Sequence, residues 1–168
     1  MKNIRNIALS ALLTIGAFTA ITYTSCNKDA CKDVVCQNGG ICLNGSCSCA
    51  TGYEGTNCET KANAKYVGTY SVTETCGGTT SNPYIVTITA GTGPSDVLVS
   101  NLGNYGCTTG GTILFNGLAA GTTLTINDSK CNTQMNATGN YANGVITISY
   151  TATYGVTVDN CTATLTKQ

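Results

Sequence analysis

Cysteine is the residue type in this sequence whose number and spacing point most directly to chemistry. The chain has 11 cysteines and no histidine. Cysteines can pair as disulfides, bind zinc as thiolates or, next to a signal peptide, carry lipid. An odd total leaves one thiol to explain, and Cys26 stands alone after an apolar N-terminal run. The other ten, which can all pair, are Cys31, Cys36, Cys42, Cys47, Cys49, Cys58, Cys76, Cys107, Cys131 and Cys161.

Residues suited to catalysis are scarce. The absence of histidine removes the commonest general acid or base and a common metal ligand. The serines therefore have no histidine to activate them. Paired carboxylates for glycoside hydrolysis are the arrangement that is left open, but Asp96, Asp128 and Asp159 all lie in Gly/Asn/Ser contexts typical of turns. We expect no enzyme, no cofactor and no metal site.

The charge of the chain excludes one class of partner. Residues 1–25 contain two of the eight basic residues and none of the eight acidic ones, so the rest of the chain has a net charge of about −2. Nucleic-acid binding needs a basic patch or stripe. We therefore expect no nucleic-acid partner.

The first 25 residues have the pattern of an export signal. Lys2 and Arg5 precede an apolar run over residues 7–21, which is shorter than the roughly 20 residues that span a membrane. The segment Thr24-Ser25-Cys26 resembles a bacterial lipoprotein cleavage site, although Tyr23 replaces the usual aliphatic residue. This resemblance implies a signal peptide at 1–25, lipidation of Cys26 and a lipidated tether at 26–30. A plain secreted protein is the alternative.

The residues after Cys26 bear on where the protein is placed. Asn27-Lys28-Asp29 resembles the short Lys/acidic signatures that direct lipoproteins of Bacteroidota-type bacteria to the outer face of the cell. The resemblance implies a membrane partner through the lipid anchor, at the outer membrane, with the protein exposed at the cell surface.

Residues 31–59 have the cysteine spacing of a small disulfide-rich module. The spacing is C-x4-C-x5-C-x4-C-x-C-x8-C, with Gly52-Tyr53 and Gly55 before the last cysteine. This pattern resembles the EGF-like family and implies the disulfides Cys31–Cys42, Cys36–Cys47 and Cys49–Cys58. Zinc is disfavoured because an exported protein meets an oxidising environment. The residues before Cys31 and the short loop from Cys42 to Cys47 also depart from the calcium-binding form of the family.

Residues 60–65 are a short polar linker, and residues 66–168 have the alternation of β-strands. Ile146, Ile148, Tyr150, Ala152 and Tyr154 alternate with Thr and Ser, which is the pattern of half-buried strands. Turn residues separate eight such runs, and no helical pattern reaches ten residues. The sequence thus predicts an all-β protein, with a small disulfide-rich EGF-like module followed by an antiparallel eight-stranded barrel or sandwich.

The four C-terminal cysteines help to choose between a barrel and a sandwich. If the strands run up and down in order, Cys76, Cys107, Cys131 and Cys161 all lie at one rim. A closed barrel makes the first and last strands neighbours, which favours Cys76–Cys161 and leaves Cys107–Cys131; a Cys76–Cys107 link would instead indicate a sandwich. The opening strand Gly68-Thr69-Tyr70 and the closing strand Cys161-Thr162-Ala163 also loosely resemble lipocalin-like domains of surface lipoproteins.

The inward-facing tyrosines offer a candidate ligand pocket. The alternation of side chains along the strands assigns seven residues to this pocket: Tyr66, Tyr70, Glu74, Tyr84, Tyr141, Tyr150 and Tyr154. Glu74 is expected at the rim, either reaching water or anchoring a ligand at the mouth of the pocket. Eight strands leave room for little besides side chains, which favours a filled interior. Two functions follow: a non-enzymatic surface lipoprotein that contacts a protein or glycan, or a lipocalin-like carrier of a small apolar ligand.

Overall fold

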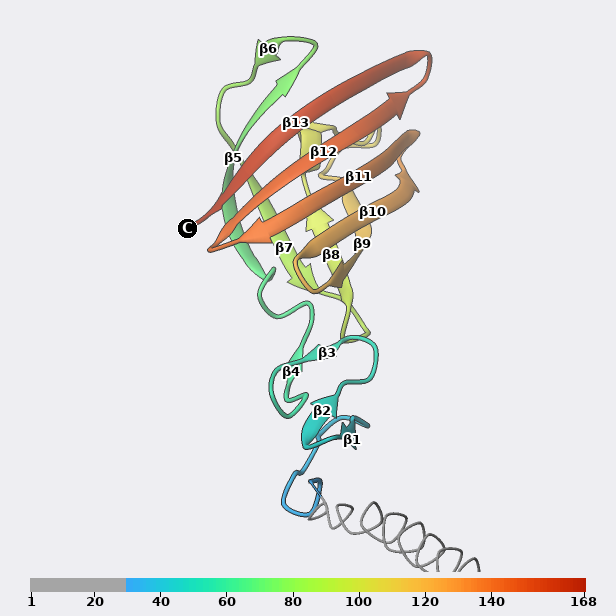
Figure 1. Ribbon diagram of the computed structural model, residues 1–168. Coiled ribbons are helices and arrows are strands. Elements are labelled where there is room, and N and C mark those ends of the chain that lie inside the picture. The colour runs from blue at the N-terminus through green and yellow to red at the C-terminus, as the bar shows by residue number, and fades with distance from the viewer. Residues whose placement is uncertain (1–29) are drawn as a thin grey trace, which may run out of the picture.

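The computed structural model describes residues 30–168 as a disulfide-rich N-terminal module joined to a β-barrel (Figure 1). The proposed signal peptide at 1–25 and the proposed lipidation site Cys26 lie outside the described residues. Apart from one short 3₁₀ turn, the regular elements of the described chain are strands. Between residues 30 and 168, no helix has the length and apolar character needed to cross a bilayer.

The N-terminal module consists of two small hairpins held by three disulfides. Strand β1 (Ile41–Leu43) pairs with β2 (Ser46–Ser48), and β3 (Tyr53–Glu54) pairs with β4 (Thr60–Lys61). The turn between β1 and β2 is Asn44-Gly45, and both residues have positive φ, as a two-residue hairpin turn requires. The disulfides are Cys31–Cys42, Cys36–Cys47 and Cys49–Cys58, the pairs expected from the sequence.

These disulfides replace the apolar core that such a small module lacks. Val35, Ile41 and Leu43 are all exposed, whereas Cys58 is fully buried. A module of this size cannot bury enough apolar surface to fold without covalent links.

The C-terminal part is a closed antiparallel barrel of eight strands, which confirms the predicted fold class and selects the barrel over the sandwich. The strands are β5 (Gly68–Cys76), β7 (Tyr84–Ala90), β8 (Asp96–Ser100), β9 (Leu114–Ala120), β10 (Thr123–Lys130), β11 (Thr133–Ala142), β12 (Val145–Tyr154) and β13 (Thr157–Lys167). Each strand pairs with the next, and β13 pairs with β5 to close the barrel. The two-residue strand β6 (Thr79–Thr80) folds back on the end of β5.

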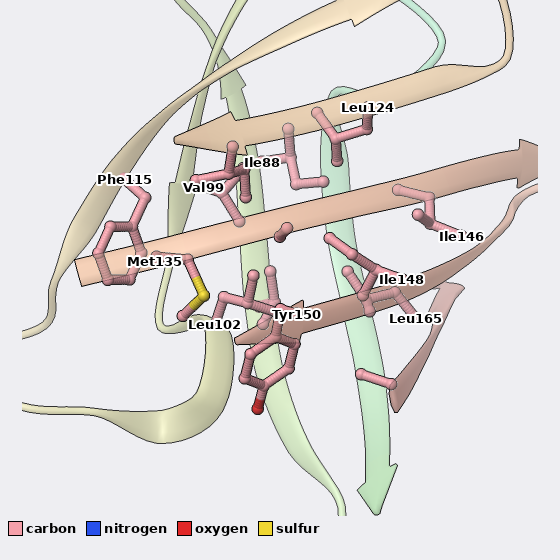
Figure 2. Close-up of a cluster of buried hydrophobic side chains, with 14 of the residues drawn as sticks. Ile88, Val99, Leu102, Phe115, Leu124, Met135, Ile146, Ile148, Tyr150 and Leu165 are labelled. Carbon is pink, nitrogen blue, oxygen red and sulfur yellow. The ribbon is translucent and has the colours of Figure 1, made fainter. Parts of the chain in front are cut away.

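The interior of the barrel is occupied by one cluster of 22 buried side chains. Figure 2 shows aliphatic residues from opposite walls, such as Ile88 and Ile148, pointing into the same space as Phe115 and Met135. Two inward-facing glycines show how tight the packing is. A Cβ atom added at Gly139 would lie 3.0 Å from Ile146, and one at Gly117 would lie 3.0 Å from the backbone oxygen of Thr125. A larger residue at either position would force its neighbours to shift by a few tenths of an ångström, so packing is close there.

The two disulfides of the barrel lie at the rim farthest from the N-terminal module. Cys76 on β5 pairs with Cys161 on β13, and Cys107 after β8 pairs with Cys131 after β10. Cys76 and Cys161 are also directly opposite each other in the register that closes the barrel. We call this end, marked by the four cysteines, the distal rim.

The residues between module and barrel are packed against both parts. Residues 60–65 were expected to form a polar linker, but β4 lies within them and Asn63 is buried. The Asn63 side chain donates hydrogen bonds to the carbonyls of Gly93 and Asp96, at 3.0 and 2.8 Å, and its backbone N–H donates to Pro94. Lys65 also forms an ion pair with Glu54, at 2.8 Å. The module is thus fastened to the loop between β7 and β8.

The two barrel disulfides should contribute unequally to stability. Cys76–Cys161 closes a separation of 85 residues and Cys107–Cys131 one of 24. By restricting the unfolded chain, the first disulfide should stabilise the fold by about 4.5 kcal/mol and the second by about 3.5 kcal/mol. The first should therefore contribute about 1 kcal/mol more. We expect Cys76→Ala/Cys161→Ala to lower the midpoint of thermal unfolding more than Cys107→Ala/Cys131→Ala, by about 4–8 °C. Equal losses, measured by calorimetry, would contradict this.

Candidate functional site

A buried carboxyl group lies just below the distal rim and binds two tyrosines. Glu74 on β5 is 7% exposed. The hydroxyl of Tyr84 on β7 donates to its Oε2 at 2.7 Å, and the hydroxyl of Tyr150 on β12 donates to the same oxygen at 2.5 Å. Figure 2 shows the Tyr150 hydroxyl at the edge of the apolar cluster, directed away from it. Glu74 is therefore mostly buried rather than a freely solvated rim carboxylate, and the two tyrosines both donate to its Oε2.

The loop of residues 101–113, between β8 and β9, covers this group from outside. Leu102, in the 3₁₀ turn η1 (Leu102–Asn104), is fully buried in the core. The N–H of Gly103 donates to the Tyr84 hydroxyl at 3.0 Å, and the Tyr105 hydroxyl donates to Asp159 on β13 at 2.7 Å. The loop is thus held to both sides of the barrel mouth, and Cys107, at the middle of the loop, links it to Cys131.

The tyrosines at the distal rim are held as neutral hydrogen-bond donors. Burial raises the pKa of Tyr150 and of Tyr84 far above the usual value for a phenol, and the hydrogen bond to Glu74 and the charge of its carboxyl raise both further. Burial and the hydrogen bond to Asp159 raise the pKa of Tyr105 in the same way. A nucleophilic phenolate would need the opposite shift, so this arrangement suits structural hydrogen bonding rather than tyrosine chemistry.

The other inward tyrosines fill the opposite end of the barrel. The hydroxyl of Tyr70 donates to the backbone oxygen of Tyr66 at 2.6 Å. The hydroxyl of Tyr66 donates to the backbone oxygen of Gly121 at 3.0 Å. The rings of Tyr66 and Tyr141 pack at a centroid distance of 5.3 Å. Burial raises the pKa of Tyr66 and of Tyr70 to about 12. The predicted pocket residues thus divide between the two ends of a filled interior.

Tyr154 was assigned to the pocket by parity, and this assignment is wrong. It lies at the last position of β12 and is 45% exposed. The hairpin of β12 and β13 extends beyond the barrel mouth (Figure 1), so an inward-directed side chain at its tip has no opposite wall to pack against. Val156 and Val158 at the same tip are also exposed.

Two hollows lie on the outer wall of the barrel. The first has a volume of about 770 Å³ and crosses β5, β13, β12, β11 and β10. The second, of about 690 Å³, crosses β10, β9, β8 and the end of β7. Thr125 and Asn127 on β10 line both, so the two hollows are neighbours on the wall. We call the residues that line them the outer track.

The side chains of the outer track come from the polar positions of the alternating strands. In the first hollow the outward-facing residues are Thr75, Thr125, Asn127, Asn136, Thr138, Ser149, Thr151, Asn160 and Thr162. The second adds Thr92, Asp96, Leu98, Asn116 and Leu118. Among the described residues lining the two hollows, Asp96 carries the one charged side chain, and its Oδ2 accepts a hydrogen bond from the N–H of Gly93.

The sequence did not predict the roles of several of these residues. Tyr105 was not among the candidate residues, and Asp159, placed in a turn, lies within β13 and accepts a hydrogen bond from Tyr105. Asp96 and Asp128 were also placed in turns, but Asp96 begins β8 and Asp128 lies within β10; both accept backbone hydrogen bonds, from Gly93 and from Asn116 and Ser129. The outer Thr/Asn/Ser residues were visible as the polar half of the alternation, but which of them line a hollow depends on the curvature of the wall.

Comparison with known proteins finds solved structures with a similar β-barrel but no family to which the chain can be assigned. No family model matches the chain, and no curated protein is significantly similar to it. A Bacteroides fragilis protein provisionally described as an outer membrane protein has a TM-score of 0.43 and 18% identity over 64% of this chain; the chain spans about half of that protein, 52%. A redesigned β-barrel has a TM-score of 0.43, with 19% identity over 66% of this chain and 97% of its own.

The zebrafish ileal bile acid-binding protein, in complex with cholic acid, has a TM-score of 0.37 and 14% identity over 62% of this chain and all of its own. At these scores the three structures resemble the barrel in general architecture, and no ligand is transferred from them to this chain.

Removal of the buried carboxyl group should lower the stability of the fold, mainly because two buried tyrosine hydroxyls lose their hydrogen-bond acceptor. Glu74→Leu leaves Tyr84 and Tyr150 without their acceptor, and we expect the free energy of unfolding to fall by about 2–4 kcal/mol in urea denaturation. The triple variant Glu74→Leu/Tyr84→Phe/Tyr150→Phe removes donors and acceptor together and should recover most of this loss. A triple variant no more stable than Glu74→Leu would contradict the assignment.

Stability should fall at high pH through the buried tyrosines. The pKa values of Tyr66 and Tyr70 are raised from 10.0 to about 12, so between these values the folded chain keeps protons that the unfolded chain releases. The contribution is complete below pH 10 and is lost as pH rises toward 12. Urea denaturation at about pH 9 and about pH 11 should show the decrease, and Tyr70→Phe should make it shallower. An unchanged slope in that variant would exclude Tyr70 as a source.

Proposed function

We propose that this protein is a non-enzymatic, lipid-anchored protein of the outer membrane, exposed at the cell surface. In this proposal an EGF-like spacer holds a solid, disulfide-clamped barrel away from the membrane, where its outer wall contacts another macromolecule. The single observation that carries the proposal is the filled interior of the barrel, with 22 buried side chains in one cluster.

A filled interior supports an external contact rather than the carriage of a small apolar ligand. A carrier of this fold needs an internal cavity of about 300–1,000 Å³. Here Tyr66 and Tyr70 close the end of the barrel nearest the N-terminal module. Glu74 and its two tyrosines close the end at the distal rim. The hollows of comparable volume lie on the outer wall. A ligand inside the barrel would have to displace the core.

The junction supports the role of the N-terminal module as a spacer. Asn63 forms three hydrogen bonds to the loop between β7 and β8 and to the first residue of β8, and these would fix the direction in which the barrel points from its support. Rigid spacers present a binding surface at lower entropic cost than flexible linkers do. The distal rim then lies at the end of the barrel farthest from the module (Figure 1).

The lipid anchor rests on Cys26 and on its place in the sequence. Four residues separate Cys26 from Cys31, the first disulfide-bonded cysteine. Fully extended, such a tether reaches about 17 Å, so lipidation would hold the spacer close to the membrane surface. Two or more acyl chains on one residue give stable anchoring.

The anchor can be tested by one substitution with a matched control. Cys26→Ser should leave the signal segment uncut and the protein without acyl chains, and so remove the protein from the outer-membrane fraction, because the modified thiol is missing. Cys31→Ser removes a thiol five residues later and should leave the protein membrane-bound. Mass spectrometry of the membrane-extracted mature protein should find a lipidated Cys26, and an unmodified N-terminus would refute the anchor.

Surface exposure needs a separate measurement. A membrane-impermeant, amine-reactive biotin should label the protein on intact cells, since Lys130 on the barrel is well exposed. Labelling only after the outer membrane is permeabilised would place the protein on the periplasmic side and contradict exposure, whatever the state of Cys26.

A further inference from the structure

We propose that the outer track binds a neutral glycan chain, an inference that rests on the proposed function of external contact and names its partner. The track consists of two hollows that share Thr125 and Asn127 and together touch all eight strands of the barrel. Neighbouring strands lie about 4.8 Å apart, so either hollow, which crosses four or five strands, is long enough for several sugar units.

The chemistry of the track matches a polymer rich in hydroxyl groups and free of charge. Threonine and serine hydroxyls both donate and accept hydrogen bonds, and asparagine amides do so through separate atoms. Sugar hydroxyls have the same dual character. Threonine methyl groups, with Leu98 and Leu118 in the second hollow, add small apolar contacts for the C–H faces of sugar rings.

Hydrogen bonds within the wall hold some of these side chains in position. Thr151 donates through Oγ1 to Oδ1 of Asn160 at 2.9 Å, which leaves the amide nitrogen of Asn160 able to donate outward. The side-chain nitrogen of Asn116 donates to Asp128 at 2.8 Å, which leaves its amide oxygen able to accept. Threonine side chains are also stiff at χ1. Because these side chains are already held in place, binding would cost little side-chain conformational entropy.

Other classes of partner fit the track less well. Nucleic acids and anionic polysaccharides need Lys or Arg, and the residues lining the track include neither. An added peptide strand needs a free sheet edge, and the pairing of β13 with β5 removes the edges of the barrel itself. Stable protein interfaces favour aromatic residues and arginine at their centre, whereas the outward side chains here, apart from Leu98 and Leu118, are short and polar.

The proposal is tested by affinity electrophoresis of the full purified chain in native gels containing a soluble polysaccharide. The neutral probes are dextran, yeast mannan, xyloglucan and a mixed-linkage β-glucan, and the anionic probes are polygalacturonate and heparin. We expect at least one neutral polymer to retard the protein, with little dependence on salt, and the anionic polymers to leave it unretarded. Failure of all four neutral polymers, or retardation by the anionic ones alone, would overturn the proposal.

Matched threonine substitutions locate the binding surface. Thr138→Val/Thr151→Val removes two hydroxyls from the first hollow while keeping side-chain shape, and should weaken binding by roughly tenfold. Thr147→Val/Thr164→Val makes the same change at exposed outward positions on β12 and β13 outside the hollows, and should leave affinity within about twofold. Equal losses in the two variants, or none in the first, would overturn the assignment to the track.

This result is independent of membrane anchoring. Binding is measured on the purified chain, so a protein that proves to be unlipidated but binds a neutral polymer through the track would refute the anchor alone. A lipidated, surface-exposed protein that binds no neutral polymer would refute the glycan and leave the proposed function in place.

Discussion

The pairing of β13 with β5 is the contact on which the rest of this structure depends. It joins seven residue pairs, from Cys161 opposite Cys76 to Lys167 opposite Tyr70, and connects the last strand of the barrel to the first. Without it, the sheet would have two open edges and one face of apolar side chains in water. With it, the inner face becomes a sealed core, the outer face becomes the whole surface, and all four barrel cysteines meet at one rim.

Much of this architecture could be predicted because the alternation of side chains along a strand is a local property. Ile146 and Ile148 are buried while Thr147 and Ser149 are exposed, as period two requires. The disulfide Cys76–Cys161 was also predictable, since an up-and-down order puts both cysteines at the same end of neighbouring strands. The pattern and the order of the strands together were sufficient to favour a barrel.

What could not be predicted depends on position along the barrel axis and on partners far away in the chain. Parity assigns Tyr154 to the inner face but does not reveal that β12 extends beyond the opposite wall. The conformation of residues 101–113 depends on Tyr84 and Asp159, which lie 19 and 54 residues from their partners in that loop. The burial of Glu74 requires both Tyr84 and Tyr150, and the pair comes together only when the barrel closes.

The disulfide between Cys76 and Cys161 also determines what happens when the backbone is cut. It encloses β6 to β12 and all of the loops between them in one covalent ring, within which Cys107–Cys131 forms a smaller ring. A protease that cleaves any one peptide bond between residues 76 and 161 would open the ring without releasing a fragment. The two pieces would stay joined through the disulfide between Cys76 and Cys161. The chain would thus remain one covalent molecule after a single cut, with the whole barrel still connected to the N-terminal module.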